Sequence, residues 1–195
     1  MKKYFQMLLV LAIATTLVTS CGKNENSEVK LNQAALVDSQ SSYSTVYNMK
    51  TVTKGGEGMA VNFTYDENGT IKTFAETTKG KVVFLNFWGT WCPPCRKEIP
   101  DIIKLQDKYK SNDLMVIGIA LERSADKAIA NVSSFGSKQG MNYMNVIGTE
   151  AIGEAYGGIS AVPTTFIIDK KGVVVEKVVG SMGLEDFEKI VKKYL

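Results

Sequence analysis

The apolar residues predict an alternation of strands and helices from about residue 60 to the C-terminus. Two apolar runs, residues 81–87 (KVVFLNF) and 114–121 (LMVIGIAL), have the length and the β-branched content of buried central strands. Between them, apolar residues recur near helical spacing from Ile99 to Tyr109, so a helix is expected after Pro94 and should end by residue 112. The pattern therefore indicates a strand, a helix and a second strand in succession.

The last third of the chain predicts a hairpin followed by a helix. Strands are expected at residues 164–168 and 173–179, joined by a turn at 169–172 (DKKG). A final helix is expected over residues 184–194, because its apolar residues share one face and its acidic residues precede its lysines, as the helix dipole favours. The remaining expected elements are a strand at residues 60–65, a turn at 67–69 and a helix over 126–138. This order indicates an α/β fold with helices on both faces of a mixed central sheet.

The first fifty residues have a different character. Two lysines precede an apolar run from Tyr4 to Val18, which is shorter than the roughly 20 residues that span a bilayer, and small polar residues follow. This arrangement is typical of a signal peptide, here residues 1–20. Residues 21–52 are rich in Ser, Asn, Gln, Glu and Lys, which predicts a flexible tether. The folded domain is therefore expected over residues 53–195.

Composition and charge exclude several classes of protein. The net charge of +3 is distributed in stretches of mixed sign without a basic arm, so nucleic acid is not an expected partner. The chain has no histidine, which excludes a Ser-His-Asp hydrolase and leaves too few ligands for a structural zinc site. We therefore expect no metal or other cofactor. We also expect the protein to be a monomer.

Two of the three cysteines, Cys92 and Cys95, form a Cys-Pro-Pro-Cys sequence where a predicted strand meets a predicted helix. Such a pair can be half of a zinc site, a structural disulfide or a redox couple. A structural disulfide that closes so small a loop would remove little entropy from the unfolded chain. Pro93 and Pro94 bias Cys92 toward an extended conformation, exposed at the positive end of the helix, where a thiolate is stabilised. The pattern favours a redox couple.

The segment at residues 87–95 (FWGTWCPPC) resembles the active site of the thioredoxin superfamily, and most closely that of the membrane-anchored, extracytoplasmic ResA/TlpA-type thiol-disulfide oxidoreductases. Roughly residues 55–195 can be placed on this family. The resemblance implies a thioredoxin-like fold in which Cys92 attacks a substrate disulfide and Cys95 resolves the mixed disulfide. The expected substrate-binding residues are Trp91, Pro93, Pro94, Val162 and Pro163.

Two further positions extend the resemblance. The sequence Ala-Val-Pro-Thr at residues 161–164 resembles the family segment in which a cis-proline, here Pro163, faces the cysteines; a plain turn proline is the alternative. Glu98 matches an acidic residue of ResA-like proteins. It shares a helix face with Cys95 and can take the proton of that thiol, unless it is a solvated surface glutamate. Asn86 stands where thioredoxin has a buried aspartate, which strengthens the case for Glu98.

Residues 18–22 (VTSCG) resemble the bacterial lipobox, which makes Cys21 the expected site of lipid attachment. The match is imperfect at Val18, where leucine is usual, and at Ser20, where glycine or alanine is usual. An uncleaved membrane helix or an ordinary secretory signal are the alternatives. Two or more acyl chains would hold the protein on the bacterial cell membrane, facing outward, in a compartment that permits disulfides.

The resemblance implies a reductase of exported, disulfide-containing proteins that receives electrons from a membrane thiol donor. The candidate substrates are apocytochrome c, a methionine sulfoxide reductase or a copper-site protein, and the sequence does not choose among them. Two other functions stay open. The same couple can form disulfides as an oxidase, or the two thiolates can bind Cu(I) in a non-catalytic module, since soft sulfur ligands suit this ion.

Overall fold

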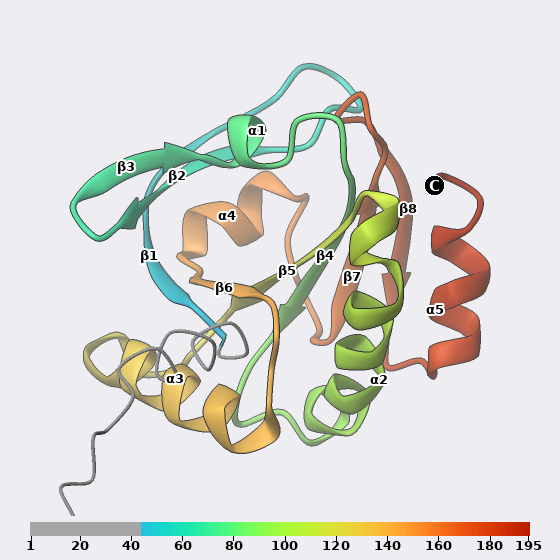
Figure 1. Cartoon of the computed structure of the whole chain (residues 1–195). Coiled ribbons are helices and arrows are strands. Elements are labelled where there is room, and N and C mark those ends of the chain that lie inside the picture. The colour runs from blue at the N-terminus through green and yellow to red at the C-terminus, as the bar shows by residue number, and fades with distance from the viewer. Residues whose placement is uncertain (1–43) are drawn as a thin grey trace, which may run out of the picture.

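A computed structural model describes residues 44–195, which form one mixed eight-stranded sheet with helices on both sides (Figure 1). The strand order is β3-β2-β1-β6-β5-β4-β7-β8. This arrangement confirms the predicted α/β class. The predicted signal peptide, Cys21 and the predicted tether up to residue 43 lie outside the described residues.

The centre of the sheet consists of the predicted apolar strands. All seven residues of β4 (Val82–Trp88) are buried, because helices pack against both faces of this strand. On one side β4 pairs in parallel with β5 (Leu114–Ala120), and on the other side it pairs antiparallel with β7 (Thr164–Ile168). The predicted hairpin is also present, since β7 continues into the edge strand β8 (Val174–Val179).

The N-terminal half of the sheet corrects the predicted domain boundary. Strand β1 (Val46–Thr53) lies within the stretch predicted as tether, so that prediction was wrong over its last residues and the folded domain begins before residue 53. The strand was missed because half of its residues are polar and most are at least partly exposed, with Met49 as its one buried residue. It pairs antiparallel with β2 (Asn62–Glu67), which continues through the predicted turn into β3 (Thr70–Thr73).

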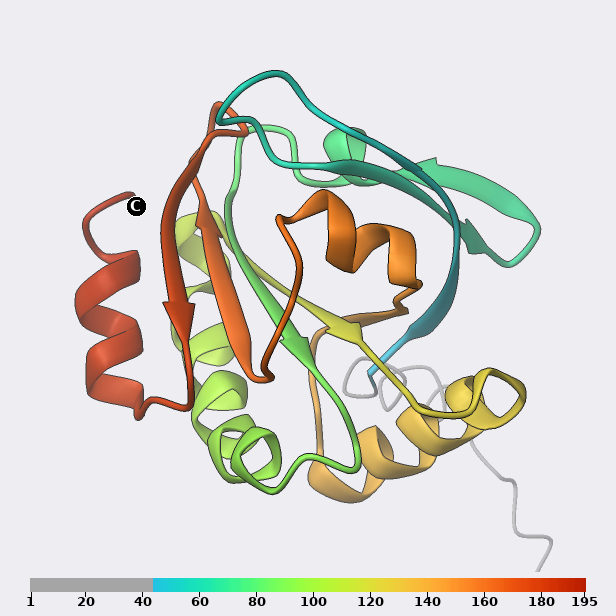
Figure 2. The same ribbon diagram turned by 180° about the vertical axis from the view of Figure 1, so that it is seen from behind.

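Helices cover both faces of the sheet (Figures 1 and 2). On one face, α2 (Pro93–Tyr109), α3 (Ala128–Gln139) and α5 (Leu184–Val191) pack against alternate residues of β4 such as Phe84. The other face, which includes Leu85 and Phe87 of β4, is covered by the shorter α1 (Phe74–Thr77) and α4 (Glu150–Ala155). Successive side chains of a strand point to opposite faces, so β4 contributes to both layers of the core.

Strand β6 (Met144–Ile147) was not predicted. It joins β5 to β1 and pairs in parallel with both of them. Its central residue, Asn145, is fully buried, and its side chain accepts a hydrogen bond from Trp88 Nε1 at 2.9 Å and donates one to Ser44 Oγ at 2.8 Å. These bonds compensate for the burial of a polar amide. They connect the start of the described chain to the end of β4, where the cysteines follow.

Candidate active site

The two cysteines lie at the C-terminal end of β4, where the chain turns into α2. Cys92 is the N-cap residue of this helix and has extended backbone angles (φ −94°, ψ 109°). Its Sγ accepts a hydrogen bond from the backbone N–H of Cys95 at 3.2 Å, and a disulfide joins the two residues. Pro93 and Pro94 occupy the first turn of the helix, where their missing N–H groups leave no helical hydrogen bond unmade.

Cys92 was predicted to be exposed, and in the disulfide form this is wrong, since only 2% of its surface is accessible. Its Sγ is bonded to Cys95 and lies 3.6 Å from the carbonyl oxygen of Val162, which covers it from the other side. The predicted substrate-binding residues Trp91, Pro93 and Pro94 are exposed around it, and Val162 is half-buried. A protein that reaches Cys92 must therefore first contact this rim.

Pro163 lies directly before β7 and follows Val162, whose carbonyl oxygen is 3.6 Å from Cys92 Sγ. The Val162–Pro163 peptide bond is cis, as the resemblance implied. The carbonyl oxygen of Pro163 accepts a hydrogen bond from the N–H of Gly180 at 2.8 Å, which connects this loop to the end of β8. Figure 2 shows the start of β7 at the same end of the sheet as the loop that leads from β4 to α2.

Glu98 is a buried residue and not a solvated surface glutamate. Its exposed fraction is 1%, and it lies one helical turn after Cys95, which is completely buried. Its Oε1 accepts a hydrogen bond from Asn86 Nδ2 at 3.0 Å, while its Oε2 has no hydrogen-bond partner among residues 44–195. The carboxyl group therefore lies inside the protein with half of its hydrogen-bonding capacity unused.

Burial is the dominant influence on the protonation of Glu98. It raises the pKa of the carboxyl group to about 7, because the charged form loses its hydration. The Asn86 amide and the backbone of Met182 pull the pKa in the opposite direction, but their effect is smaller. Glu98 therefore keeps its proton to a higher pH than an exposed glutamate does.

The sequence did not reveal the partners of Glu98. Asn86 is 1% exposed within β4, and its Nδ2 also donates to Thr165 Oγ1 of β7 at 3.0 Å. One amide thus connects the carboxyl group on α2 to the strand that follows Pro163. The only signal in the sequence is a lone asparagine within an apolar strand, a position at which a buried polar group needs partners from elsewhere.

Trp91 is held at the rim by residues that follow β5. Its Nε1 donates a hydrogen bond to the carbonyl oxygen of Leu121 at 2.8 Å, and the guanidinium of Arg123 lies 4.3 Å above its ring. The indole approaches Gly89 so closely that a Cβ at this position would lie 2.6 Å from Nε1. A glycine between β4 and the cysteines is therefore needed for this placement of Trp91.

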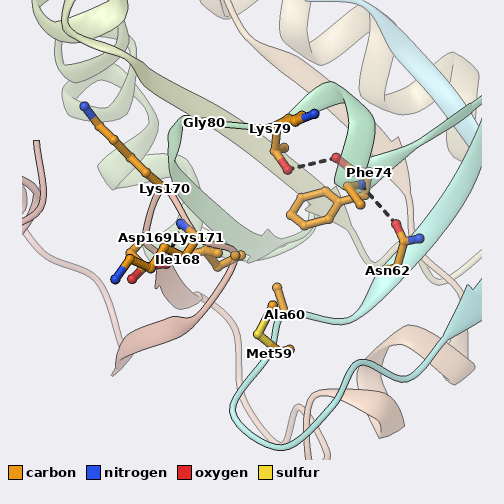
Figure 3. A pocket seen from close by; sticks show the side chains of 13 residues that line it. Met59, Ala60, Asn62, Phe74, Lys79, Gly80, Ile168, Asp169, Lys170 and Lys171 are labelled. Atoms are coloured by element: carbon orange, nitrogen blue, oxygen red, sulfur yellow. Dashed lines mark hydrogen bonds between the residues drawn. The ribbon is translucent and has the colours of Figure 1, made fainter.

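Figure 3 shows a cavity of about 180 Å³ that lies away from the cysteines. It is lined by residues that precede β4, such as Gly80, and by the turn that follows β7, such as Gly172, whereas the cysteines follow β4. The side chain of Lys170 extends away from the cavity in Figure 3 and pairs with Asp113 at 3.2 Å. This cavity shares no residue with the site around Cys92.

Within residues 44–195, no three His, Cys, Asp or Glu side chains gather as the ligands of a metal ion would. No helix in this part of the chain is long and apolar enough to cross a bilayer.

A cysteine disulfide at the start of a helix, opposite a cis-proline in a mixed α/β sheet, defines the class of thioredoxin-fold thiol-disulfide oxidoreductases. The chain belongs to the Redoxin family, whose model matches residues 49–194. Its similarity to known proteins in sequence and structure identifies it as a ResA/TlpA-like member of the thioredoxin superfamily. This confirms the resemblance seen in the sequence and the predicted enzyme class.

Relatives in sequence and in structure agree with this assignment. The chain is 38% identical over 136 residues to the thiol-disulfide oxidoreductase ResA of Bacillus thuringiensis (strain Al Hakam), which covers 69% of this chain and 75% of that protein. It is 33% identical over 157 residues to ResA of Bacillus subtilis (strain 168), covering 76% of this chain and 84% of the relative. The crystal structure of a thiol:disulfide interchange protein from Chlorobium tepidum TLS superposes with a TM-score of 0.61 at 32% identity, covering 74% of this chain and 97% of that one.

Proposed function

We propose that the protein reduces disulfides in exported proteins through the Cys92/Cys95 couple. The observation that carries the exchange chemistry is the buried Glu98, one helical turn from Cys95, with a pKa near neutrality and an unpartnered oxygen, while the reducing direction follows the similarity to ResA-type proteins. Reduction of a substrate requires that the second, buried thiol lose its proton inside the protein. A carboxylate whose pKa is matched to the operating pH is suited to accept that proton.

The proposed reaction begins with the reduced protein. The Cys92 thiolate attacks one sulfur of the substrate disulfide, which breaks the substrate S–S bond, forms a mixed disulfide and releases one substrate thiolate that takes up a proton. Cys95 then gives its proton to Glu98 and attacks Cys92 Sγ. This second step forms the Cys92–Cys95 disulfide and releases the other substrate thiolate. Two electrons have passed from the cysteine pair to the substrate, and a membrane thiol donor would restore them.

The local geometry supports these roles. Negative charge on Cys92 Sγ is stabilised by the N-terminus of α2 and by the hydrogen bond from the N–H of Cys95 at 3.2 Å. The carbonyl of Val162, 3.6 Å from Sγ, marks the backbone beside which a substrate chain would lie, with Pro163 behind it. The exposed Trp91, Pro93 and Pro94 would contact the substrate around the reacting sulfur.

We place the protein outside the cytoplasm, attached to the membrane by a lipid on Cys21. The signal-like segment, its lipobox-like end and the resemblance to ResA/TlpA-type proteins support this location. In a bacterial host, the full chain should appear in the membrane fraction, and Cys21→Ser should shift it to the soluble fraction or leave the signal peptide uncleaved. A wild-type protein in the soluble fraction would contradict the anchor. The substrate candidates remain apocytochrome c, a methionine sulfoxide reductase and a copper-site protein.

The reduction potential tests the direction of the reaction. The chain from residue 22 onward would be equilibrated in thiol buffers, and the fluorescence of Trp88 and Trp91 would report the state of the cysteines nearby. A reductase predicts a value between about −270 mV, as in thioredoxin, and about −200 mV. A value near −120 mV, as in strong oxidants, would overturn the proposal in favour of disulfide formation.

A further inference from the structure

Glu122 contacts the turn that precedes Cys92 through two hydrogen bonds. The backbone N–H of Thr90 donates to Glu122 Oε1 at 2.7 Å, and the hydroxyl of Thr90 donates to Glu122 Oε2 at 2.8 Å. Both carboxylate oxygens are thus used by one residue, which lies two positions before the cysteine. Hydrogen bonds to a charged acceptor are short and stronger than neutral ones, and the paired arrangement fixes orientation as well as distance.

The parallel pairing of β4 and β5 brings these two segments together. Trp88 and Ala120 are partners at the ends of the two strands, and the N–H of Leu121 donates to the carbonyl oxygen of Trp88 at 2.8 Å. The residues after both strands therefore leave the sheet side by side. Thirty-two residues separate Thr90 from Glu122 in the sequence, so the contact depends on the register of the sheet.

The position of Thr90 determines the position of Cys92. The N–H of Cys92 donates to the carbonyl oxygen of Gly89 at 3.1 Å, which closes a four-residue turn with Thr90 at its second position. The indole of Trp91 also contacts the segment after β5, but Glu122 provides the only side chain among residues 44–195 that hydrogen-bonds Thr90. Movement of this turn would move Cys92 relative to Val162 and to the start of α2.

We propose that Glu122 is a positioning residue for disulfide exchange: by binding both donors of Thr90, it holds Cys92 Sγ in the orientation that lets a substrate disulfide approach it in line. Exchange proceeds through three sulfurs in a row, so its rate depends on the direction of Sγ as well as on its reactivity. A misplacement of about 1 Å can reduce the rate of an oriented reaction by about 10²-fold. Glu122 acts through Thr90 and does not take part in the bond changes.

Two substitutions separate geometry from charge. Glu122→Ala removes both hydrogen bonds and the negative charge. Glu122→Gln removes the same charge but keeps an acceptor for the Thr90 N–H, and its amide can donate to the Thr90 hydroxyl, which is able to rotate. A role in positioning predicts that Glu122→Gln keeps the rate of disulfide reduction that Glu122→Ala loses. An effect of charge alone predicts that both variants change equally.

The experiment compares reduction of insulin disulfides with alkylation of Cys92 by iodoacetamide, each over a range of pH, for the full chain in detergent. Alkylation reports the reactivity of the thiolate and requires no fixed approach, whereas reduction of a protein disulfide does. We expect Glu122→Ala to slow insulin reduction at least tenfold and Glu122→Gln to stay within threefold of wild type. Maximal alkylation rates should stay within twofold in both variants.

Glu154 provides a matched control. It is an exposed glutamate that lines a surface pocket together with Glu122, and it makes no side-chain hydrogen bond to Thr90. Glu154→Ala removes one negative charge there and should reduce insulin within twofold of the wild-type rate. Urea unfolding of each variant checks that the fold is intact. Insulin reduction that is unchanged in Glu122→Ala, or that falls equally in Glu122→Gln, would overturn the proposal. A wild-type protein that fails to reduce insulin would instead count against the proposed reductase function.

Discussion

Cys95→Ser is expected to convert the protein into a trap that remains joined to its substrate through Cys92. The first exchange needs only Cys92, whereas release of the substrate needs the thiol of Cys95, which lies three residues away inside α2. Intramolecular reactions of this kind reach effective molarities of about 10⁵ M or more, which millimolar thiols in solution cannot replace. We therefore expect turnover of a protein disulfide to fall by at least about 10³-fold. Non-reducing electrophoresis would show the adduct, and mass spectrometry would locate it at Cys92.

The matched control is Cys92→Ser, which keeps Cys95 in its buried position. It should neither turn over nor accumulate an adduct, because Cys95 is completely buried and the exposed rim of Trp91, Pro93 and Pro94 surrounds the other cysteine. Adducts of equal yield in both variants would show that the two thiols are equally accessible. The assignment of Cys92 as the attacking residue would then be wrong.

The sequence predicted those parts of the fold whose environment is uniform. Strands β4 and β5 are buried on both faces, so apart from Asn86 their composition is apolar, which identifies them without further information. Strand β1 lies between β2 and β6 with only Met49 buried, and β6 carries the fully buried Asn145. A polar residue within a strand resembles a loop until its partners are known, and here the partner is Trp88, 57 residues away.

In the candidate site, too, the sequence predicted the local features and missed the contacts between distant residues. The cysteines and Glu98 lie within one short segment, so a local motif was enough to find them, and the cis peptide bond at Pro163 followed from the resemblance. The missed contacts include one from Asn86 to Thr165 across 79 residues and one from Thr90 to Glu122 across 32. Each connects neighbouring strands or the segments after them, and only the strand order and register bring such residues together.

Glu98→Gln is expected to remove a pH dependence from the stability of the disulfide form. Burial raises the pKa of Glu98 from 4.5 to about 7, so between these values the folded protein binds more protons than the unfolded chain. The free energy of unfolding should therefore fall as the pH rises through this window, by about 3 kcal/mol in total, and become level at about pH 8. Glutamine cannot ionise, so the variant should lack this decrease. Between pH 4 and pH 8 it should therefore lose less of its free energy of unfolding than wild type does.

Urea unfolding from pH 4 to pH 8, with the disulfide intact, measures this dependence. Glu188→Gln is a control of opposite sign, because Lys108 and Lys192 lower the pKa of that half-buried carboxyl group. Its contribution to stability is present at neutral pH and is lost as the pH falls, so this variant should be slightly less stable than wild type at pH 8 and should match it at low pH. Equal pH dependence in wild type and Glu98→Gln would contradict the raised pKa.

The same substitution tests the proposed proton transfer. In the reduced protein, Glu98→Gln leaves Cys95 without a nearby base, whereas Cys92 keeps the N-terminus of α2 and the N–H of Cys95. We therefore expect the mixed disulfide to form at nearly the wild-type rate and to resolve between about 10²- and 10⁴-fold more slowly at pH 7, the range typical of a lost general base. Rapid mixing with acid quenching separates the two steps. If both steps slow equally, the effect of Glu98 lies in the structure around Cys92 and not in taking the proton of Cys95.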